Sequence, residues 1–386
     1  MQNRFDTTKT FADDLELRVY TSNLLGIDQD LVLHGGGNTS LKTEDTLYVK
    51  GSGWDLSTIK KEGFSPVDLD VLQKMAILDS LSDSDMVAKQ RAALRDTSAP
   101  NPSIEAILHA IIPYKFVDHT HADAVVTISN SINGEEIIKE LYKDYLIVPY
   151  IMPGFILAKK VYEMTKGNFD WERCKGIILH HHGIFTFDDD GKKSYDKMID
   201  SVAIAEEYLN QNAPLDVKTY TPKNYDITKL QKLIEEKKEH PVVLKPIQTP
   251  LALTYASGED LFQKVTRGVL TPEHIIRTKR EPLVIEDENF EAALQNFEDR
   301  YRSYFERYAK DEVMLSPTPN YIVLKDFGLI AIGKNEKEAS IIADIITHTA
   351  KAVLQADKLG GYRSINEEES FKMEYWELEQ AKLKGK

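Results

Sequence analysis

The alternation of short apolar stretches with longer stretches of helical periodicity limits what this chain can fold into more than any other feature. The apolar stretches, which are typical of strands, lie at residues 46–49, 116–118, 124–128 and 176–179. Helices are predicted over residues 12–25, 68–80, 103–112, 134–143 and 194–210. Strands that alternate with helices along a chain usually form a sheet covered by helical layers. We therefore expect a layered α/β fold.

The composition changes between residues 211 and 250, where Lys, Glu and Pro become frequent. This pattern is typical of a solvated helix followed by a connecting segment. A chain of 386 residues is also long enough for two domains, since about 100 to 200 residues per domain are usual. The sequence therefore predicts a first α/β domain over 1–215, a helical linker over 216–250 and a C-terminal α/β domain over 251–386.

The C-terminal domain resembles a degenerate repeat of part of the first. Residues 178–195 can be laid over residues 323–340, so that Gly183 matches Gly328 and a helical stretch follows in both. A strand, a glycine turn and a helix also recur by chance in unrelated segments. If the similarity is a true repeat, the second copy lacks the polar side chains of the first.

Charge and cysteine content exclude several classes of partner. With 48 basic and 62 acidic side chains, the formal charge of -14 repels nucleic acid and anionic lipid over most of the surface. The apolar stretch 145–158 is shorter than the roughly 20 residues of a membrane span, and residues 1–14 lack the apolar core of a signal peptide. The single Cys174 forms neither an intrachain disulfide nor a multi-cysteine metal site. We expect a cytoplasmic protein that binds any anionic substrate in a local pocket.

One basic cluster stands out against this acidic background. The second domain contains Arg277, Lys279 and Arg280 within a stretch of four consecutive positions. They can reach a phosphate or line a domain interface, and the sequence favours the interface.

Histidines carry the strongest chemical signal. His119 and His121 follow an apolar run, and residues at i and i+2 of a strand point to the same face. A third histidine is available in the His180–His182 run, which follows the predicted strand 176–179. Three imidazoles with an open fourth position are typical of catalytic zinc sites. The alternative is that these histidines form a solvated turn or cap buried carbonyl groups.

A carboxylate at the start of the predicted helix 103–112 is the second signal. Glu105 lies in the first turn, after Pro102 and Ser103. Near a metal, such a carboxylate serves as a general acid or base. In the structural alternative Ser103 caps the helix and Glu105 interacts with the helix dipole.

Two glycine-rich segments form the third signal. Residues 35–40 (GGGNTS) and 50–53 (KGSG) offer backbone N–H groups, hydroxyls and one cation, which are the groups needed to hold a phosphate. Neither has the spacing of a P-loop or of a dinucleotide-binding motif. Tight turns are the alternative reading of each segment.

Together these motifs resemble those of the class II aldolase/adducin family, in the family's order. The motifs are G-N-x-S (Gly37–Ser40), S-G (Ser52–Gly53), P-S-x-E (Pro102–Glu105), H-x-H (His119–His121) and H-H-G (His181–Gly183). Longer phrases such as LHGGGNTS, YVKGSGWDL, FVDHTHADAVV and EYWELEQAKL look like the aldolase part of bifunctional rhamnulose-1-phosphate aldolase/short-chain dehydrogenase proteins. Since this sequence ends at Lys386, before the dehydrogenase domain of those proteins, no dehydrogenase activity is expected.

The resemblance implies a three-layer α/β/α domain and a metal-dependent aldolase. It implies that His119, His121 and His182 bind Zn²⁺ or another divalent metal and that Glu105 is the catalytic carboxylate. The substrate would be a ketose 1-phosphate similar to rhamnulose 1-phosphate, cleaved to dihydroxyacetone phosphate and a small aldehyde such as lactaldehyde. Relatives often form tetramers, so a homo-oligomer is expected.

The resemblance also implies a phosphate site formed by Gly37, Asn38, Ser52, Gly53 and Ser103. One departure concerns this site, because simple fuculose-phosphate aldolases often read P-S-S-E where this chain has Ile104. One phosphate-binding hydroxyl is therefore missing. Either Lys50, Ser40 or a residue of another subunit replaces it, or the anionic group of the substrate binds in a different position.

Two other functions stay open. A sugar-phosphate epimerase or dehydratase would use the same metal site, although epimerases tend to have Asp at the position of Glu105. A non-catalytic, adducin-like scaffold would keep the fold without the chemistry. That reading predicts broken ligand positions, whereas the three histidines and Glu105 are all present.

Overall fold

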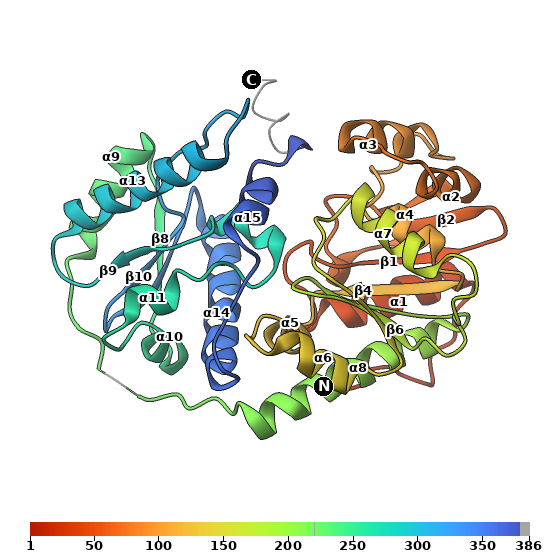
Figure 1. The fold of residues 1–386 in the computed structure, drawn as a ribbon, viewed down its shortest axis with the longest axis horizontal. Coiled ribbons are helices and arrows are strands. Elements are labelled where there is room, and N and C mark those ends of the chain that lie inside the picture. Colours follow the sequence, from red (N-terminus) through yellow and green to blue (C-terminus); the bar gives the residue numbers. More distant parts are fainter. Residues whose placement is uncertain (220, 379–386) are drawn as a thin grey trace. The chain divides into compact units, whose positions relative to one another are not determined.

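The computed structural model describes residues 1–219 and 221–378, in which the chain folds into two compact units (Figure 1). The first unit consists of Met1–Ser129 and Glu135–Tyr208. The second consists of Asn130–Gly134 together with the chain from Leu209 onward. Each unit has a sheet of its own.

A seven-stranded sheet with the order β3-β2-β1-β4-β7-β6-β5 forms the centre of the first unit. Its strands are β1 (Asn38–Lys42), β2 (Thr46–Lys50), β3 (Phe64–Asp68), β4 (Phe116–Thr120), β5 (Tyr145–Val148), β6 (Gly176–Leu179) and β7 (Gly183–Asp188). Neighbouring strands are antiparallel except β5 and β6, which are parallel. Every position of the central strands β1 and β4 is buried, because helices cover both faces of the sheet.

The helices in this part of the chain are α1 (Asp14–Gly26), α2 (Leu69–Ala76), α3 (Asp83–Ala92), α4 (Ala106–Ile111), α5 (Asp123–Ser129), α6 (Gly134–Leu141), α7 (Phe155–Thr165) and α8 (Gly191–Asn212), with short 3-10 helices η1 (Leu56–Thr58) and η2 (Lys61–Gly63). On one face of the sheet, Val117 of β4 packs in an apolar core with side chains of α2, α4 and α7. On the other face, the carboxylate of Asp118 pairs with Arg18 of α1 and accepts a hydrogen bond from Ser194 of α8, each at 2.5 Å. Consecutive strand residues point to opposite faces, so the predicted three-layer α/β/α architecture is confirmed.

Most predicted elements of the first unit are present, but one was assigned the wrong type. The segment 124–128 was expected as a strand, whereas it belongs to the helix α5. All residues of α5 are buried, so the helix has no exposed polar face that would produce a helical stripe in the sequence. A short apolar run of this kind fits a buried strand and a buried helix equally well.

The second unit has a four-stranded sheet with the order β8-β11-β10-β9. Its strands are β8 (Val243–Ile247), β9 (Leu283–Ile285), β10 (Tyr321–Leu324) and β11 (Gly328–Gly333), and its helices are α9 (Ile227–Lys238), α10 (Pro250–Tyr255), α11 (Leu261–Val265), α12 (Ile275–Thr278), α13 (Phe290–Tyr308), α14 (Glu336–Lys358) and α15 (Glu367–Glu374), with the 3-10 helix η3 (Pro272–His274). The apolar core on one face of the sheet includes Leu230 of α9 and Phe297 of α13. The long helix α14 packs on β8 and β11.

The second unit repeats the arrangement of the C-terminal half of the first. In both, an antiparallel hairpin (β6–β7 or β10–β11) leads into a long helix (α8 or α14), a parallel strand (β5 or β9) borders one side and an antiparallel strand (β4 or β8) borders the other. The three elements of the second hairpin-and-helix set begin at one constant offset from those of the first. The hairpin turns agree in conformation, since His181 and Asp326 have positive φ angles of 62° and 57°. Phe327 stands where the first unit has His182, so the polar side chain is absent from the second copy.

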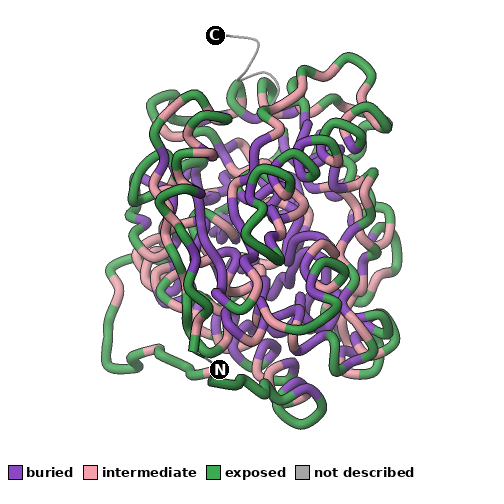
Figure 2. Tube along the Cα trace, turned by 90° about the vertical axis from the view of Figure 1, so that its left-hand side faces the viewer, coloured by how far each residue is buried: buried purple, intermediate pink, exposed green. Residues whose placement is uncertain are grey.

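The segment expected as a linker belongs largely to the second unit. Helix α9 contributes Leu230 and Ile234 to the apolar core, and β8 pairs with β11 in the sheet. Residues 214–219, which follow α8, are exposed. Figure 2 colours the trace by burial, with buried positions in purple and exposed positions in green. Among the described residues, no helix has the length and apolar character needed to cross a bilayer.

Candidate metal centre and active site

Three histidine rings meet where β4 and β6 end. His119 lies in β4, His121 follows that strand, and His182 lies in the turn between β6 and β7. One ring nitrogen from each lies within 4.8 Å of the other two. His119 and His182 are buried, whereas His121 is half-buried and closer to solvent. The structure thus brings together the three residues that the sequence motifs selected.

The orientation of His119 is fixed by the backbone of the neighbouring strand. Its Nδ1 lies 3.1 Å from the carbonyl oxygen of Ile184 in β7, and a carbonyl oxygen only accepts. The proton therefore resides on Nδ1, and the unprotonated Nε2 faces Nε2 of His121 at 3.0 Å. Stacking on Phe185, with ring centroids 4.1 Å apart, holds the plane of the ring.

The two preceding histidines of the triple run have other neighbours. The backbone N–H of His181 donates to Ser129 Oγ at 3.0 Å, and its ring lies edge-on to Tyr150. The ring of His180 packs against that of His181, with centroids 4.2 Å apart.

Glu105 faces the histidine group instead of capping its helix. The residue precedes α4, and its side chain makes no capping hydrogen bond. One carboxylate oxygen, Oε2, lies 3.5 Å from His119 Nε2, and the other, Oε1, lies 3.8 Å from His182 Nε2. Within the described part of the chain, the buried Oε1 has no hydrogen-bond partner. Ser103 Oγ accepts from the backbone N–H of Glu105 at 3.3 Å, so the hydroxyl orders the turn that carries the carboxylate.

A chain of buried polar groups supports Glu105 from behind. Asn38 Nδ2 donates to Glu105 Oε2 at 2.7 Å, and its Oδ1 accepts from His109 Nε2. Burial is the main reason that the pKa of His109 lies well below its usual value, so this ring is neutral. With its proton on Nε2, His109 accepts at Nδ1 from the hydroxyl of Ser40, at 2.8 Å. Each donor in this series of hydrogen bonds points towards Glu105, so the carboxylate of Glu105 acts as the final acceptor.

The sequence motifs do not predict every residue of this hydrogen-bond series. The motifs do not include His109, and they suggest Ser40 only as a substitute phosphate ligand. Asn38 and Ser40 are i and i+2 in β1, and Glu105 and His109 are i and i+4 along α4. Each spacing places two polar side chains on one face of its element. Which strand then lies against which helix depends on the tertiary fold.

The first glycine loop lies directly against the strand that carries His119. Gly37 has a positive φ of 60°, and a Cβ atom there would approach the carbonyl oxygen of His119 to 2.7 Å and Val32 to 2.6 Å. Only glycine lets the loop come this close. Asn38 follows at once, so the loop places that side chain next to Glu105.

The second glycine loop lies beside the segment that leads to Glu105. The backbone N–H of Ser103 donates to Lys50 O at 3.0 Å, and that of Ser52 donates to Asn101 O at 2.7 Å. Ser52 and Gly53 are exposed, and Ser103 is half-buried. The hydroxyl groups of Ser52 and Ser103 lie at the edge of the site, whereas the backbone N–H groups of these two serines are already hydrogen-bonded within the protein.

Lys50 connects the two glycine loops. Its Nζ donates to the carbonyl oxygen of Gly35 at 3.0 Å, and only 5% of the residue is exposed. Burial lowers the pKa of Lys50 to about 8, although Asp55 and Glu105 act in the opposite direction. The site thus contains one buried cation next to the carboxylate and the loops.

The residues present fit a divalent metal ion. Three imidazole nitrogens converge, and one ring has its tautomer fixed by a carbonyl group, which is the usual support of a metal-binding histidine. A three-histidine set leaves positions open for substrate oxygens and accepts zinc as well as other divalent metals.

Two family models and one curated relative match this chain. The model of the class II aldolase and adducin N-terminal domain matches residues 16–209, and that of the aldolase class II second domain matches residues 224–383. The uncharacterized oxidoreductase YuxG of Bacillus subtilis (strain 168) is 30% identical over 96% of this chain. The chain spans 58% of the length of that relative.

Several solved structures are also similar to part of this chain. The N-terminal class II aldolase domain of a conserved protein from Thermoplasma acidophilum is 41% identical, with a TM-score of 0.50, and covers 54% of this chain and 99% of its own. The L-fuculose-1-phosphate aldolase of Thermus thermophilus is 15% identical, with a TM-score of 0.36, over 51% of this chain and 95% of its own. From the fold, the three converging histidines and the two matching domain models, it follows that this chain belongs to the class II aldolase/adducin family.

Proposed function

We propose that this protein is a divalent-metal-dependent, most simply zinc-dependent, aldolase that cleaves a ketose 1-phosphate to dihydroxyacetone phosphate and a small aldehyde such as lactaldehyde. The observation that carries the proposal is the position of Glu105. Its two oxygens lie 3.5 and 3.8 Å from Nε2 of two histidines in the converging group. A metal site with an adjacent, buried carboxylate is what proton transfer next to a polarised carbonyl requires.

When bound, the metal supplies an electrophile that polarises the substrate carbonyl. The chain contributes the proton transfer: Glu105, held by Asn38, takes up or returns the proton at the carbon that was part of the cleaved bond. Burial of Glu105 and His119 excludes bulk water from these atoms, which strengthens every electrostatic interaction there.

The phosphate of the substrate is held by the two glycine loops in this proposal. The loops contribute Gly37, Asn38, Ser52, Gly53 and Ser103. Lys50 supplies the positive charge and replaces the hydroxyl that is missing at Ile104. The proposed enzyme works in the cytoplasm as a homo-oligomer, and its net charge of -14 opposes binding to nucleic acid and membranes.

The direct test combines metal analysis with an assay of dihydroxyacetone phosphate released from a panel of ketose 1-phosphates, including rhamnulose and fuculose 1-phosphate. The wild-type protein should contain about one metal ion per chain and release the product from at least one of these substrates. His119→Ala and His182→Ala should lose both metal and turnover, because two imidazoles do not hold the ion as tightly as three.

Glu105→Gln separates chemistry from metal binding. The amide keeps the shape of the side chain but cannot take up a proton, so the variant should retain its metal and lose exchange of the dihydroxyacetone phosphate proton with solvent by about a hundredfold or more. Undiminished exchange would remove Glu105 from the mechanism. Epimerised or dehydrated sugar phosphate as the sole product would favour the rival enzymes, and stoichiometric metal in both histidine variants would refute the ligand assignment.

A further inference from the structure

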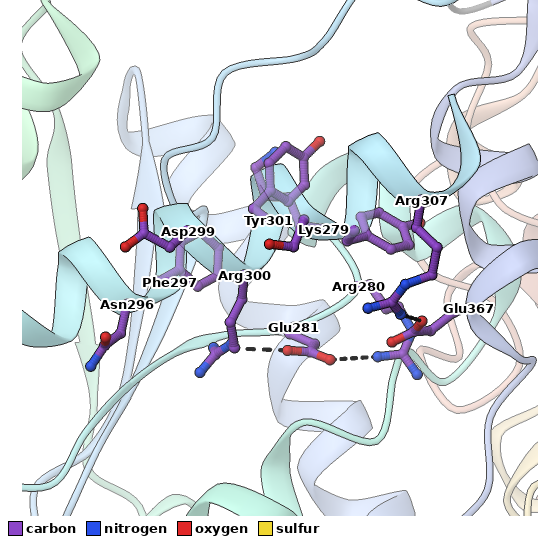
Figure 3. A pocket seen from close by; sticks show the side chains of 12 residues that line it. Lys279, Arg280, Glu281, Asn296, Phe297, Asp299, Arg300, Tyr301, Arg307 and Glu367 are labelled. Carbon is purple, nitrogen blue, oxygen red and sulfur yellow. Dashed lines mark hydrogen bonds and ion pairs between the residues drawn. The ribbon is translucent and has the colours of Figure 1, made fainter. Parts of the chain in front are cut away.

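A cavity of about 420 Å³ lies within the second unit and is lined by residues of that unit. It is formed by the segment Lys279–Glu281, which precedes β9, by the C-terminal half of α13 and by Glu367 of α15 (Figure 3). Its size is in the range of small-molecule sites. Phe297 and Tyr301 of α13 provide apolar surface in its wall.

This cavity is not a remnant of the duplicated metal site. In the second unit, the residue that corresponds to His182 is Phe327, which follows the C-terminal end of β10 and packs near Tyr225. Lys279–Glu281 precede the N-terminal end of β9, which runs parallel to β10. The cavity therefore lies at the opposite ends of the strands from Phe327. Any ligand in it contacts residues that do not correspond to the histidine site of the first unit.

Charged side chains form a row along the cavity. Glu281 lies between two guanidinium groups, with Oε1 2.5 Å from Arg280 Nη1 and Oε2 3.8 Å from Arg300 Nη2 (Figure 3). Arg307 pairs with Glu367 at the end of this row. Asp299 also lines the cavity, but Figure 3 shows its carboxylate pointing away from the row.

The charges in this row do not balance. Lys279 is neutralised by the buried Glu374, whose Oε1 lies 3.6 Å from Nζ, and Arg307 is neutralised by Glu367. What is left is the cluster Arg280, Glu281 and Arg300, with two positive charges and one negative charge. Burial raises the pKa of the Glu281 carboxyl, although both arginines act in the opposite direction, so this carboxylate is not fully stabilised by its neighbours.

Both arginines of the cluster also have a donor without an acceptor. Among the residues that the structure describes, the buried Nε atoms of Arg280 and Arg300 have no hydrogen-bond partner. Buried donors are normally paired, since an unpaired one loses its bonds to water without replacement. Two guanidinium groups that line one cavity and carry a surplus positive charge match the planar oxygens of a carboxylate or the oxygens of a phosphate.

We propose that the Arg280–Glu281–Arg300 cluster binds the oxyanion group, phosphate or carboxylate, of a small metabolite whose remaining atoms lie against Phe297 and Tyr301. The second unit thus has a ligand site of its own. The site does not depend on the metal or on the reaction of the first unit.

The test is isothermal titration calorimetry on the full-length, metal-loaded protein with inorganic phosphate in one series and succinate in another. Wild-type protein should bind at least one of the two probes saturably, and the series that binds identifies the oxyanion. Arg300→Met and Arg280→Met should each weaken that binding at least tenfold. Arg300→Lys keeps the charge but removes the Nε donor, so it should also weaken binding, and it serves as the second variant if the methionine substitutions lower the melting temperature.

Arg302→Met is the matched control. Arg302 is exposed on the same helix and does not line the cavity, so its removal changes the net charge equally and should leave binding unchanged. Binding that persists in folded Arg300→Met and Arg280→Met protein belongs elsewhere, including the glycine loops of the first unit, and overturns the proposal. Absence of binding of both probes to the wild-type protein overturns it as well.

Discussion

At the scale of single residues, the site depends on how burial and hydrogen bonding set the charge of a few groups. Glu105 accepts from Asn38, which is held in turn by His109 and Ser40. The hydrogen bonds all run in one direction, because the neutral ring of His109 accepts from the hydroxyl of Ser40 and donates to the amide oxygen of Asn38. Lys50 is the one charged group of the glycine loops, and its charge depends on pH within the range in which enzymes are assayed.

We predict that kcat/KM for a phosphorylated substrate falls above pH 8. Burial lowers the pKa of Lys50 to about 8, so the side chain is protonated below that pH and loses its positive charge above it. The loss removes the attraction for the substrate phosphate, and kcat/KM reports ionisations of the free enzyme. Steady-state kinetics between pH 6 and about 10 measure the profile.

Substitutions of lysine test the assignment of this pH dependence. Lys50→Met should lower kcat/KM at pH 7 by about tenfold or more and abolish the fall above pH 8, because a charge-assisted contact is lost at every pH. Lys60→Met removes an exposed lysine nearby and should leave the profile unchanged. A basic limb that persists in Lys50→Met would show that another group titrates.

At the scale of elements, the hairpin turn that carries His182 depends on one glycine. A Cβ atom at Gly183 would lie 2.3 Å from the carbonyl oxygen of Thr120 in β4. The second unit has the same contact, since a Cβ atom at Gly328 would lie 2.3 Å from the carbonyl oxygen of Ile247 in β8. The glycine brings the hairpin against the bordering strand in both copies, but among the described residues only the first copy has converging histidines there.

The two glycines form a matched pair for a stability experiment. Gly183→Ala and Gly328→Ala should each lower the free energy of unfolding of their own unit by about 1–3 kcal/mol, because the backbone must move to admit the methyl group. Gly183→Ala should also weaken metal binding, since Thr120 lies between His119 and His121. Gly328→Ala should leave metal affinity and turnover unchanged. Urea unfolding and metal titration measure both effects, and equal metal affinity in the two variants would contradict the role given to the first turn.

At the scale of the whole molecule, the chain consists of two units with separate sheets and separate apolar cores. The converging histidines all belong to the first unit, whereas the arginine cavity belongs to the second. A ligand that binds only the native form of one unit stabilises that unit. Metal binding is therefore expected to act on one part of the molecule.

Calorimetry before and after metal removal tests this expectation. We predict two thermal transitions, of which a chelator lowers only one. At a free metal concentration of about 100 times Kd, bound metal contributes about 2.7 kcal/mol, which corresponds to a shift of several degrees in a unit of this size. His119→Ala should show the lower transition without any chelator. A shift of both transitions by the same amount would contradict the independence of the two units.

The sequence by itself determined the elements and residues whose signals are local. Helical periodicity located α1, α2, α4, α6 and α8, and the i, i+2 spacing of His119 and His121 indicated a shared face. The recurring strand–glycine–helix pattern predicted the duplicated hairpin. These features depend only on residues a few positions apart, so the sequence predicts them directly.

The tertiary structure alone decided what depends on residues distant in the chain. The run 124–128 is a helix because it is enclosed on every side, which no local pattern distinguishes from a buried strand. The stretch between 216 and 250 reads as solvated because α9 exposes one face, yet its other face and β8 complete the second unit. The sequence leaves open whether Glu105 interacts with the helix dipole or faces the histidines, and the fold decides this by placing Asn38 of β1 beside its carboxylate. Long-range packing fixes such pairs, and periodicity along the sequence contains no information about which distant strand supplies the partner.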